Sequence, residues 1–289
     1  MRVLGVNKIV INTIGHDIKG SVVLWLDHVL AQEGRGFVNW SGNFIKEGSS
    51  TLFNGLYSYA TPPRQWIYDS SVSGANIPTG VYINNNLSGR NSHITLDFQR
   101  GEVLFDSNVN ATVSGRLAYK EVNIYTTNQT EEFLLFENQF QQNPTTSPSF
   151  TGFSVTDKPV PCIFVKQNAP TNKIVSFERL SENVHNIRLI LVSDSEYIFQ
   201  SVVNILADKK ERHIPLFSAA EMPINGYGDL KSGSFNYDNV CSAIQVDANR
   251  LCRIKDIRIS TFTDRVNFLI NPKAAGAFID LELEAFRYI

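Results

Sequence analysis

Three carboxylates near the end of the chain have the residue type and spacing of an acid–base pair. Asp280, Glu282 and Glu284 alternate with apolar residues in FIDLELEAF, so they share one face of a predicted strand. Paired carboxylates are the catalytic groups of most glycoside hydrolases. A solvated outer face explains the same pattern if basic residues of an earlier strand pair with them across the sheet. Those basic residues are Arg253, Lys255 and Arg258. A third interpretation is an acidic band that faces a neighbouring subunit or the lumen of a ring.

The remaining groups that could do chemistry are isolated from one another. The five histidines are His16, His28, His93, His185 and His213. None is paired with another His or with a Cys at metal-ligand spacing, so we expect no metal site. The chain contains no Gly-x-Ser-x-Gly motif, Walker A loop or dinucleotide fingerprint. We therefore assign no catalytic, cofactor-binding or metal-binding residue, and we expect no cofactor and no enzymatic activity.

Three cysteines, Cys162, Cys241 and Cys252, occur without a Cys-x-x-Cys motif. Cys162 lies in VPCIFV and Cys252 lies in LCRIKDI, and both positions are typical of small buried apolar residues in strands. The sequence allows a disulfide between Cys241 and Cys252 but does not require it. The thiol usage fits a reducing compartment.

Large aromatic residues gather in the Gly-, Ser- and Asn-rich region 35–92. They include Trp40, Tyr57, Tyr59, Trp66 and Tyr68. Exposed aromatic side chains on β loops can stack on sugars or anchor protein contacts, whereas buried ones fill a small core. The core interpretation is favoured, because large aromatic side chains dominate core burial, and the exposed one is kept as the alternative. The candidate interface residues of the chain are Asp280, Glu282, Glu284, Trp40, Trp66 and Tyr68.

The charge balance of the chain limits its partners. The 289 residues have a formal net charge of −2 and an isoelectric point of about 6.2. A nucleic-acid binder needs a surplus of Lys and Arg on one face, so this balance argues against electrostatically driven binding of nucleic acid. The charged fraction is 19%, below the usual level of about 25%, which favours a surface partly covered by partners. No apolar run approaches the length of about 18 residues that a membrane span needs.

The first half of the chain has mostly strand signals. We predict a strand at 3–11 and a helix at 21–33, followed by a hairpin in HITLDFQRGEVLF with Gly101 at the reversal. A long strand then begins near Val113, and its inward parity changes at Lys120-Glu121, which predicts a β-bulge. We expect EEFLLFEN to close this strand cluster.

The second half mixes strands with one helix. VPCIFVKQN, KIVSFERL and HIPLF predict strands, and the apolar run NIRLILV (186–192) predicts a strand buried on both faces. Ser193 and Glu196 form a predicted capping box for a helix over 194–207. The predicted terminal strands are 252–261, 265–270 and 277–286.

These elements indicate a mainly β fold with few short helices. We predict a β-sandwich-like domain with one N-terminal helix at 1–138 and an α+β domain with one capped helix at 160–289. Between them, residues 139–159 are rich in Gln, Pro, Ser and Thr, which is typical of a linker or of an arm that contacts a neighbour.

Two segments together resemble virion structural proteins of tailed bacteriophages, chiefly those of the neck and tail region. The segments are IRLILVSDSEYIFQSVVNILADKKERHIPLF and LDFQRGEVLF…GRLAYKEVNIY. The resemblance covers about half of the chain. It lies in the general pattern of these segments and in no diagnostic motif, so no functional residue is carried over. It implies a β-rich, non-enzymatic virion protein that is made in the host bacterial cytoplasm and assembled as a ring around the DNA path.

We therefore expect a structural subunit of a phage particle, forming a ring at the head–tail junction as a neck, connector or tail-completion protein. Its expected partners are copies of itself and other virion proteins, with genomic DNA only as the content of the lumen and with no membrane. The alternative is a tail-fibre, baseplate or carbohydrate-binding recognition protein that uses the aromatic region 35–92. An enzyme that uses the acidic stripe is the third interpretation.

Overall fold

The computed structural model of the protein describes most of the chain. The described residues are 14–49, 55–61, 65–91, 93–137, 139–141, 157–168, 171–174, 180–245, 247, 250–262 and 275–288. Within them the protein is mainly β, with several sheets and few helices, which confirms the predicted fold class. The strands predicted at 3–11 and 265–270 lie outside the described residues.

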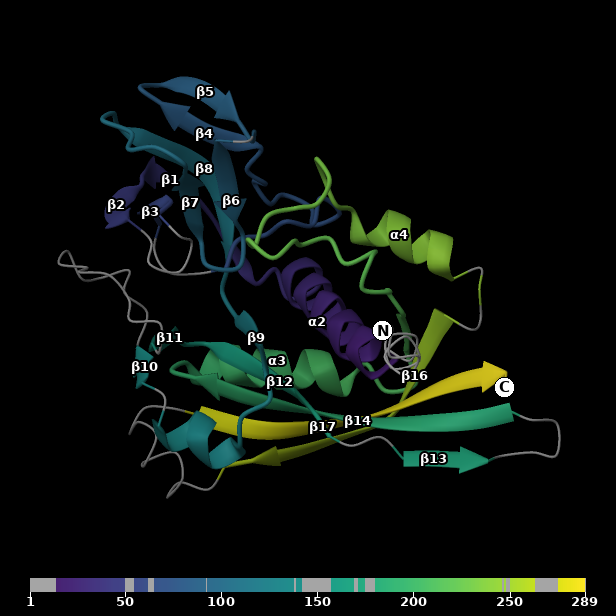
Figure 1. Ribbon diagram of the computed structural model, residues 1–289. Helices are drawn as coiled ribbons and strands as arrows, with labels where there is room; N and C mark the ends of the chain where they lie inside the picture. Colours follow the sequence, from purple (N-terminus) through teal and green to yellow (C-terminus); the bar gives the residue numbers. More distant parts are fainter. Residues whose placement is uncertain are drawn as a thin grey trace, which may run out of the picture.

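Two four-stranded sheets form the N-terminal part of the molecule (Figure 1). In sheet order, the first consists of β1 (Phe37–Asn43), β8 (Val113–Lys120), β4 (Gly80–Ile83) and β5 (Asn86–Gly89). The second consists of β2 (Ile45–Ser49), β3 (Tyr57–Ala60), β7 (Glu102–Phe105) and β6 (Ile94–Asp97). Leu117 of the first sheet and Leu96 and Val103 of the second are buried in one core. The predicted hairpin is confirmed as β6 and β7, and Gly101 has the left-handed φ of +76° that the reversal requires.

A seven-stranded sheet forms the other half of the protein. Its path is β15 (His213–Pro215), β16 (Leu251–Thr261), β17 (Ala275–Tyr288), β14 (Leu180–Ser193), β12 (Cys162–Gln167) and β9 (Asn123–Thr127). The seventh strand, β13 (Thr171–Ile174), pairs with the first part of β14. Leu189 and Leu191 of β14 enter the main core, whereas Ile190 and Val192 enter a second cluster on the other face. The prediction of a strand buried on both faces is therefore confirmed.

Helices α2 (Ile14–Gln32) and α3 (Glu196–Ala207) cover the inner face of this sheet (Figure 1). The predicted helix at 21–33 is correct in type but begins seven residues later than α2. On the outer face, the helical turn η1 (Phe133–Glu137) packs Leu134 and Leu135 onto the second cluster. The strand predicted for EEFLLFEN is wrong, because a helical turn can bury two adjacent leucines on one surface and an alternating strand cannot.

Three further details correct the sequence predictions. The β-bulge predicted at Lys120-Glu121 is wrong, because β8 ends at Lys120 and β9 begins three residues later in the other sheet. The change of parity therefore marks a transfer between sheets. The cap of α3 is Ser195, whose Oγ accepts a hydrogen bond from the Ile198 N–H, while Ser193 is the last residue of β14. The short helix α4 (Tyr237–Ile244) has no counterpart among the predicted elements.

The predicted boundary after residue 138 does not coincide with the change of sheet. Strand β9 precedes that boundary, yet it pairs in parallel with β12 from the other side of it. Within the predicted arm 139–159, β10 (Gln139–Gln141) pairs in parallel with β11 (Asp157–Pro159). The residues between these two strands lie outside the described part of the chain, so the role of the arm stays a prediction.

Candidate functional site

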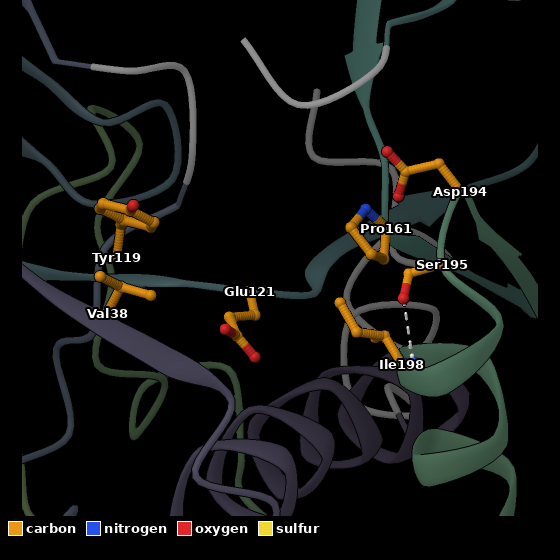
Figure 2. Close-up of a pocket in the computed structure, with 7 residues that line it drawn as sticks. All are labelled: Val38, Tyr119, Glu121, Pro161, Asp194, Ser195 and Ile198. Carbon is orange, nitrogen blue, oxygen red and sulfur yellow. Dashed lines mark hydrogen bonds between the residues drawn. The ribbon is translucent and has the colours of Figure 1, made fainter. Parts of the chain in front are cut away.

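A pocket of about 230 Å³ lies where the first N-terminal sheet meets the start of α3. Its lining residues are Val38, Tyr119, Glu121, Pro161, Asp194, Ser195 and Ile198. Figure 2 shows Val38 and Tyr119 on one wall, Pro161, Ser195 and Ile198 opposite them, and Glu121 between the two. We call this the junction pocket. It is built from β1, from the chain that leaves β8, and from the segments that begin β12 and α3.

The chemistry of the junction pocket is that of an acidic cavity with apolar walls. Glu121 and Asp194 contribute carboxylates from two different segments, and no Lys or Arg is among the seven lining residues. Val38 and Ile198 contribute apolar surface. A long aliphatic side chain with a cationic head combines the two properties, since its stem packs on apolar walls while its charge meets carboxylates. The pocket therefore fits a Lys or Arg side chain better than an anion.

The predicted acidic stripe lies on the outer face of the seven-stranded sheet, where the chain supplies its own cations. Asp280 receives two hydrogen bonds from the Arg188 guanidinium, at 2.6 and 2.8 Å. These bonds raise the pKa of Arg188 above its usual value. Lys255 pairs with both Glu282 and Glu284, and Arg258 lies 3.5 Å from Glu282. The stripe is therefore largely neutralised within one chain, as the cross-strand interpretation expects.

The three aromatic candidates divide into two kinds. Trp66 and Tyr68 are buried in the main core, where both rings contact Phe98 edge-on. They fill the core, so their assignment as interface residues is wrong. Trp40 is half-buried on β1 and packs its ring against Phe44. It is the one candidate of the three that also reaches the surface.

A buried polar network ties α2 to the first N-terminal sheet. The Lys120 ammonium donates to Asp27 Oδ1 at 2.6 Å, and the Tyr68 hydroxyl donates to Asp27 Oδ2 at 2.7 Å. Burial and the Asp27 carboxylate raise the pKa of Tyr68 well above its usual value, so the hydroxyl keeps its proton. Gln65 extends the network by donating to the Ile124 carbonyl and accepting from the Ile124 N–H. The network holds β8, β9 and the helix in register.

A second network contains an Asp–His–Ser group, but its geometry is not that of a catalytic triad. His28 Nδ1 lies 2.8 Å from Asp69 Oδ2 and 3.3 Å from Ser71 Oγ, so the acid and the hydroxyl share one ring nitrogen. In a triad they bind opposite nitrogens. Burial would raise the pKa of Asp69, but hydrogen bonds from His28, Ser71 and the Tyr237 N–H hold that pKa below its usual value. The arrangement joins α2 to α4.

The thiols offer little nucleophilic character. All three cysteines are buried and none forms a disulfide, so the bond left open between Cys241 and Cys252 is not formed. Burial raises the pKa of Cys241 to about 11 and that of Cys252 to about 12. Both groups are thiols at neutral pH, and the thiol is a much weaker nucleophile than the thiolate.

In the described part of the chain, no three His, Cys, Asp or Glu side chains come together as a metal site would require. No helix in those same segments has the length and apolar character to cross a membrane.

Sequence reasoning missed the junction pocket because its residues come from segments separated by up to 160 positions. No spacing pattern connects Val38, Glu121 and Asp194, since the pocket exists only after β8 leaves its sheet next to α3. The available signal was the uncharged stretch FVNWSGN, which becomes β1. No protein-family model matches the chain, and no curated protein matches it.

Proposed function

We propose that this protein is a non-enzymatic structural subunit of a phage particle that assembles into a ring at the head–tail junction. The observation that supports this proposal is an open edge strand beside an acidic pocket. Ring subunits meet through unlike surfaces that close by rotation, so each copy needs a surface that accepts a neighbour. The edge of β1 and the junction pocket together supply such a surface.

Strand β1 lacks the features that normally protect a sheet edge. It is seven residues long, FVNWSGN, with no charge and no proline, and it pairs with β8 without a register shift. In the described sheets it is the longest edge strand, and it pairs with β8 alone. By contrast, β2 has two charged residues and a register shift, and β15 is three residues long and ends in Pro215. Unprotected edges recruit further strands.

Sedimentation of the purified full-length chain over a range of concentrations tests the proposal directly. We expect closed oligomers of one size, visible as rings by electron microscopy, because an interface made of two unlike surfaces closes at a fixed number of copies. Assembly should weaken as salt rises if the acidic pocket contributes to it, since exposed charges are screened. A chain that stays monomeric at every concentration and enters no particle would contradict the proposal.

One observation favours the alternative, a tail-fibre, baseplate or carbohydrate-binding recognition protein. A second pocket, of about 270 Å³, lies beside β4 and β5 and is lined by Tyr82, Arg116 and Asn76 among others. An aromatic ring with amide and guanidinium groups can bind a sugar by stacking and hydrogen bonds. Glycan binding by a monomeric chain, lost in the Tyr82→Ala variant and retained in Tyr197→Ala, would favour this alternative. Tyr197 is a matched control because it is exposed on α3, outside this pocket.

A further inference from the structure

We propose that the first N-terminal sheet continues from copy to copy, with β1 of one copy pairing antiparallel with β5 of the next. This inference rests on the proposed self-assembly and names the two surfaces that would meet. Its basis is the state of the two edges of that sheet, the direction of its strands and the residues whose backbone groups point outward.

Both edges of the first N-terminal sheet lack protection. Strands β1 and β5 lie at its opposite edges, with β5 at the top of the molecule in Figure 1. Neither FVNWSGN nor NLSG contains a charged residue or a proline, and both strands pair without a register shift. Val38 of β1 is 38% exposed and Leu87 of β5 is 59% exposed. Charges, prolines and bulges are the usual protection of an edge, so this sheet can accept strands on both sides.

The chain covers edges of the other two large sheets with its own polar groups. On β6, the Leu96 N–H donates to the Asp229 carboxylate. On β9, the Gln65 side chain donates to the Ile124 carbonyl and accepts from the Ile124 N–H. A neighbouring strand would have to displace these groups. The first N-terminal sheet is therefore the better place for a neighbour to add.

The backbone of β1 is oriented to accept another strand. The Phe44 N–H donates to the Val113 carbonyl just beyond the end of β1. Because hydrogen-bonded pairs alternate along an antiparallel ladder, the even-numbered residues of β1 bond to β8 and the odd-numbered ones point their backbone groups outward. Asn39 and Ser41 are two such residues, and no described residue bonds to their backbone N–H or C=O.

Strand β5 presents the complementary set of backbone groups. The Arg90 N–H donates to the Thr79 carbonyl just beyond the end of β5, in the same register as the β4–β5 pairs. The alternation then directs the backbone groups of Leu87 and Gly89 away from β4. No described residue bonds to these groups either. Each edge therefore offers alternate N–H and C=O groups that the other can pair.

The directions of the strands fit a ring. Neighbours are antiparallel at every step from β1 through β8 and β4 to β5, so β1 and β5 run in opposite directions. When copies repeat by rotation, β5 of the next copy meets β1 antiparallel, as the strands within one copy do. The two surfaces are unlike, as ring closure requires. Pairing of β1 with β1 would also be antiparallel, but it would stop at two copies and leave β5 unused.

Proline substitution blocks one edge at a time in the full-length chain. Ser41→Pro and Leu87→Pro each remove an outward N–H that the sheet of the same copy does not use. Each variant should need at least a tenfold higher concentration to assemble by sedimentation, with a melting temperature within a few degrees of the parent's. Ser41→Ala and Leu87→Ala are the matched controls, because they keep the N–H, and they should assemble within about threefold of the parent.

Mixing the two proline variants tests which edges meet. Ser41→Pro keeps an intact β5 edge and Leu87→Pro keeps an intact β1 edge, so an equimolar mixture should form dimers of one copy of each. Neither variant alone should form dimers at the same concentration. Dimers of Leu87→Pro alone would show that β1 pairs with β1, and a mixture that stays monomeric while the parent assembles would also overturn the inference.

Hydrogen exchange in the parent chain gives a second test that needs no variant. On assembly, the amides of residues 37–43 and 86–89 should both exchange more slowly, whereas those of β6 should change little because the chain already covers that edge. Protection of residues 37–43 alone would overturn the pairing. If the parent never assembles, the proposed function itself fails. If the parent assembles and both proline variants assemble equally well, only the strand pairing is wrong.

Discussion

Two groups of carboxylates in this molecule differ in what the chain places beside them. On the outer face of the seven-stranded sheet, Asp280, Glu282 and Glu284 each lie within ion-pair distance of an Arg or Lys of the same chain. In the junction pocket, Glu121 and Asp194 contribute two carboxylates, and none of the seven described lining residues is a Lys or Arg. The first group is paired within one copy, whereas the second lines a cavity whose carboxylates and apolar walls would fit a cationic side chain.

The difference shows why an acidic pattern in a sequence does not identify an interface. The stripe was prominent because its members alternate along one strand, but the same regularity lets a neighbouring strand present cations in register. The two carboxylates of the pocket are inconspicuous in sequence, since they lie 73 positions apart. Whether a carboxylate is available to a partner depends on the cations that folding brings to it.

The largest effect should follow from breaking a charge pair that is fully buried. Lys120→Met leaves the buried Asp27 carboxylate without its cation, and among the described residues the Tyr68 hydroxyl is then its remaining side-chain donor. Removal of one partner of a buried pair costs about 3–5 kcal/mol of unfolding free energy. Urea unfolding measures this loss.

The double variant Asp27→Asn/Lys120→Met is the control for this prediction. It should regain part of the lost free energy, because an amide is less costly to bury than an unpaired carboxylate. A single variant within about 1 kcal/mol of the parent would mean that the pair contributes little and that α2 is held to β8 by apolar packing alone.

An intermediate effect is expected at Asp97, a buried carboxylate whose pairing is incomplete. Burial, with the nearby Glu102, raises the pKa of Asp97 to about 7, and the Arg100 Nε is 3.9 Å away. The folded protein then binds a proton that the unfolded chain releases near pH 4, so stability falls as pH rises from about 4 to about 7. The full change is about 4 kcal/mol, at 1.4 kcal/mol for each of about three units between the two pKa values.

Asp97→Asn should remove this part of the pH dependence. The amide oxygen can still accept the Gln99 and Arg100 N–H groups that Asp97 Oδ1 accepts now, at 2.9 and 3.0 Å. The variant should match the parent below about pH 4 and exceed it above pH 7 in free energy of unfolding. Parallel pH profiles for the two proteins would show that Asp97 ionises normally in the fold.

Periodicity predicted the elements whose burial follows one regular rule. The hairpin around Gly101, the doubly buried strand at 186–192 and the helix ending at Ala207 follow from alternation or from three- and four-residue spacing. The errors lie where a segment serves two surfaces. Lys120 ends a strand in one sheet just before the chain enters another. Leu134 and Leu135 both pack on the outer face of the seven-stranded sheet, and the sequence around them does not show that this surface is there to bury them.

The candidate site was less predictable than the fold, because it depends on contacts between distant segments. Trp66 and Tyr68 stayed interface candidates because the Gly- and Asn-rich region around them could not decide between burial and exposure, and the fold decides it by packing both rings against Phe98. In the sequence, Asp194 is an ordinary residue at the start of a helix. The fold brings it into one pocket with Val38 and Glu121, which no local pattern predicts. The uncharged composition of β1 is the one sequence signal that could have indicated an interaction surface there, and it was not recognised.

Two isosteric substitutions should have the smallest effect on stability. They compare the acidic stripe with the junction pocket most directly. Glu282→Gln and Asp194→Asn each remove one negative charge with little change of shape. Glu282 is partly exposed and belongs to an ion-pair network with Lys255 and Arg258. Loss of its charge should therefore change the free energy of unfolding by at most about 0.5 kcal/mol. Asp194 precedes the cap of α3, and its loss should have an effect of similar size.

The two variants should differ in the concentration at which they assemble, although their free energies of unfolding should be similar. Glu282→Gln should sediment like the parent. Lys255 keeps its ion pair with Glu284, and Arg258 keeps its ion pair with Asp256. Asp194→Asn should require a several-fold higher concentration to assemble, and the deficit should shrink in high salt, where screening already weakens the attraction of the parent's pocket for a cation. Equal assembly of the two variants would place the interacting acidic surface elsewhere. The reverse order would return the interface to the outer face of the seven-stranded sheet.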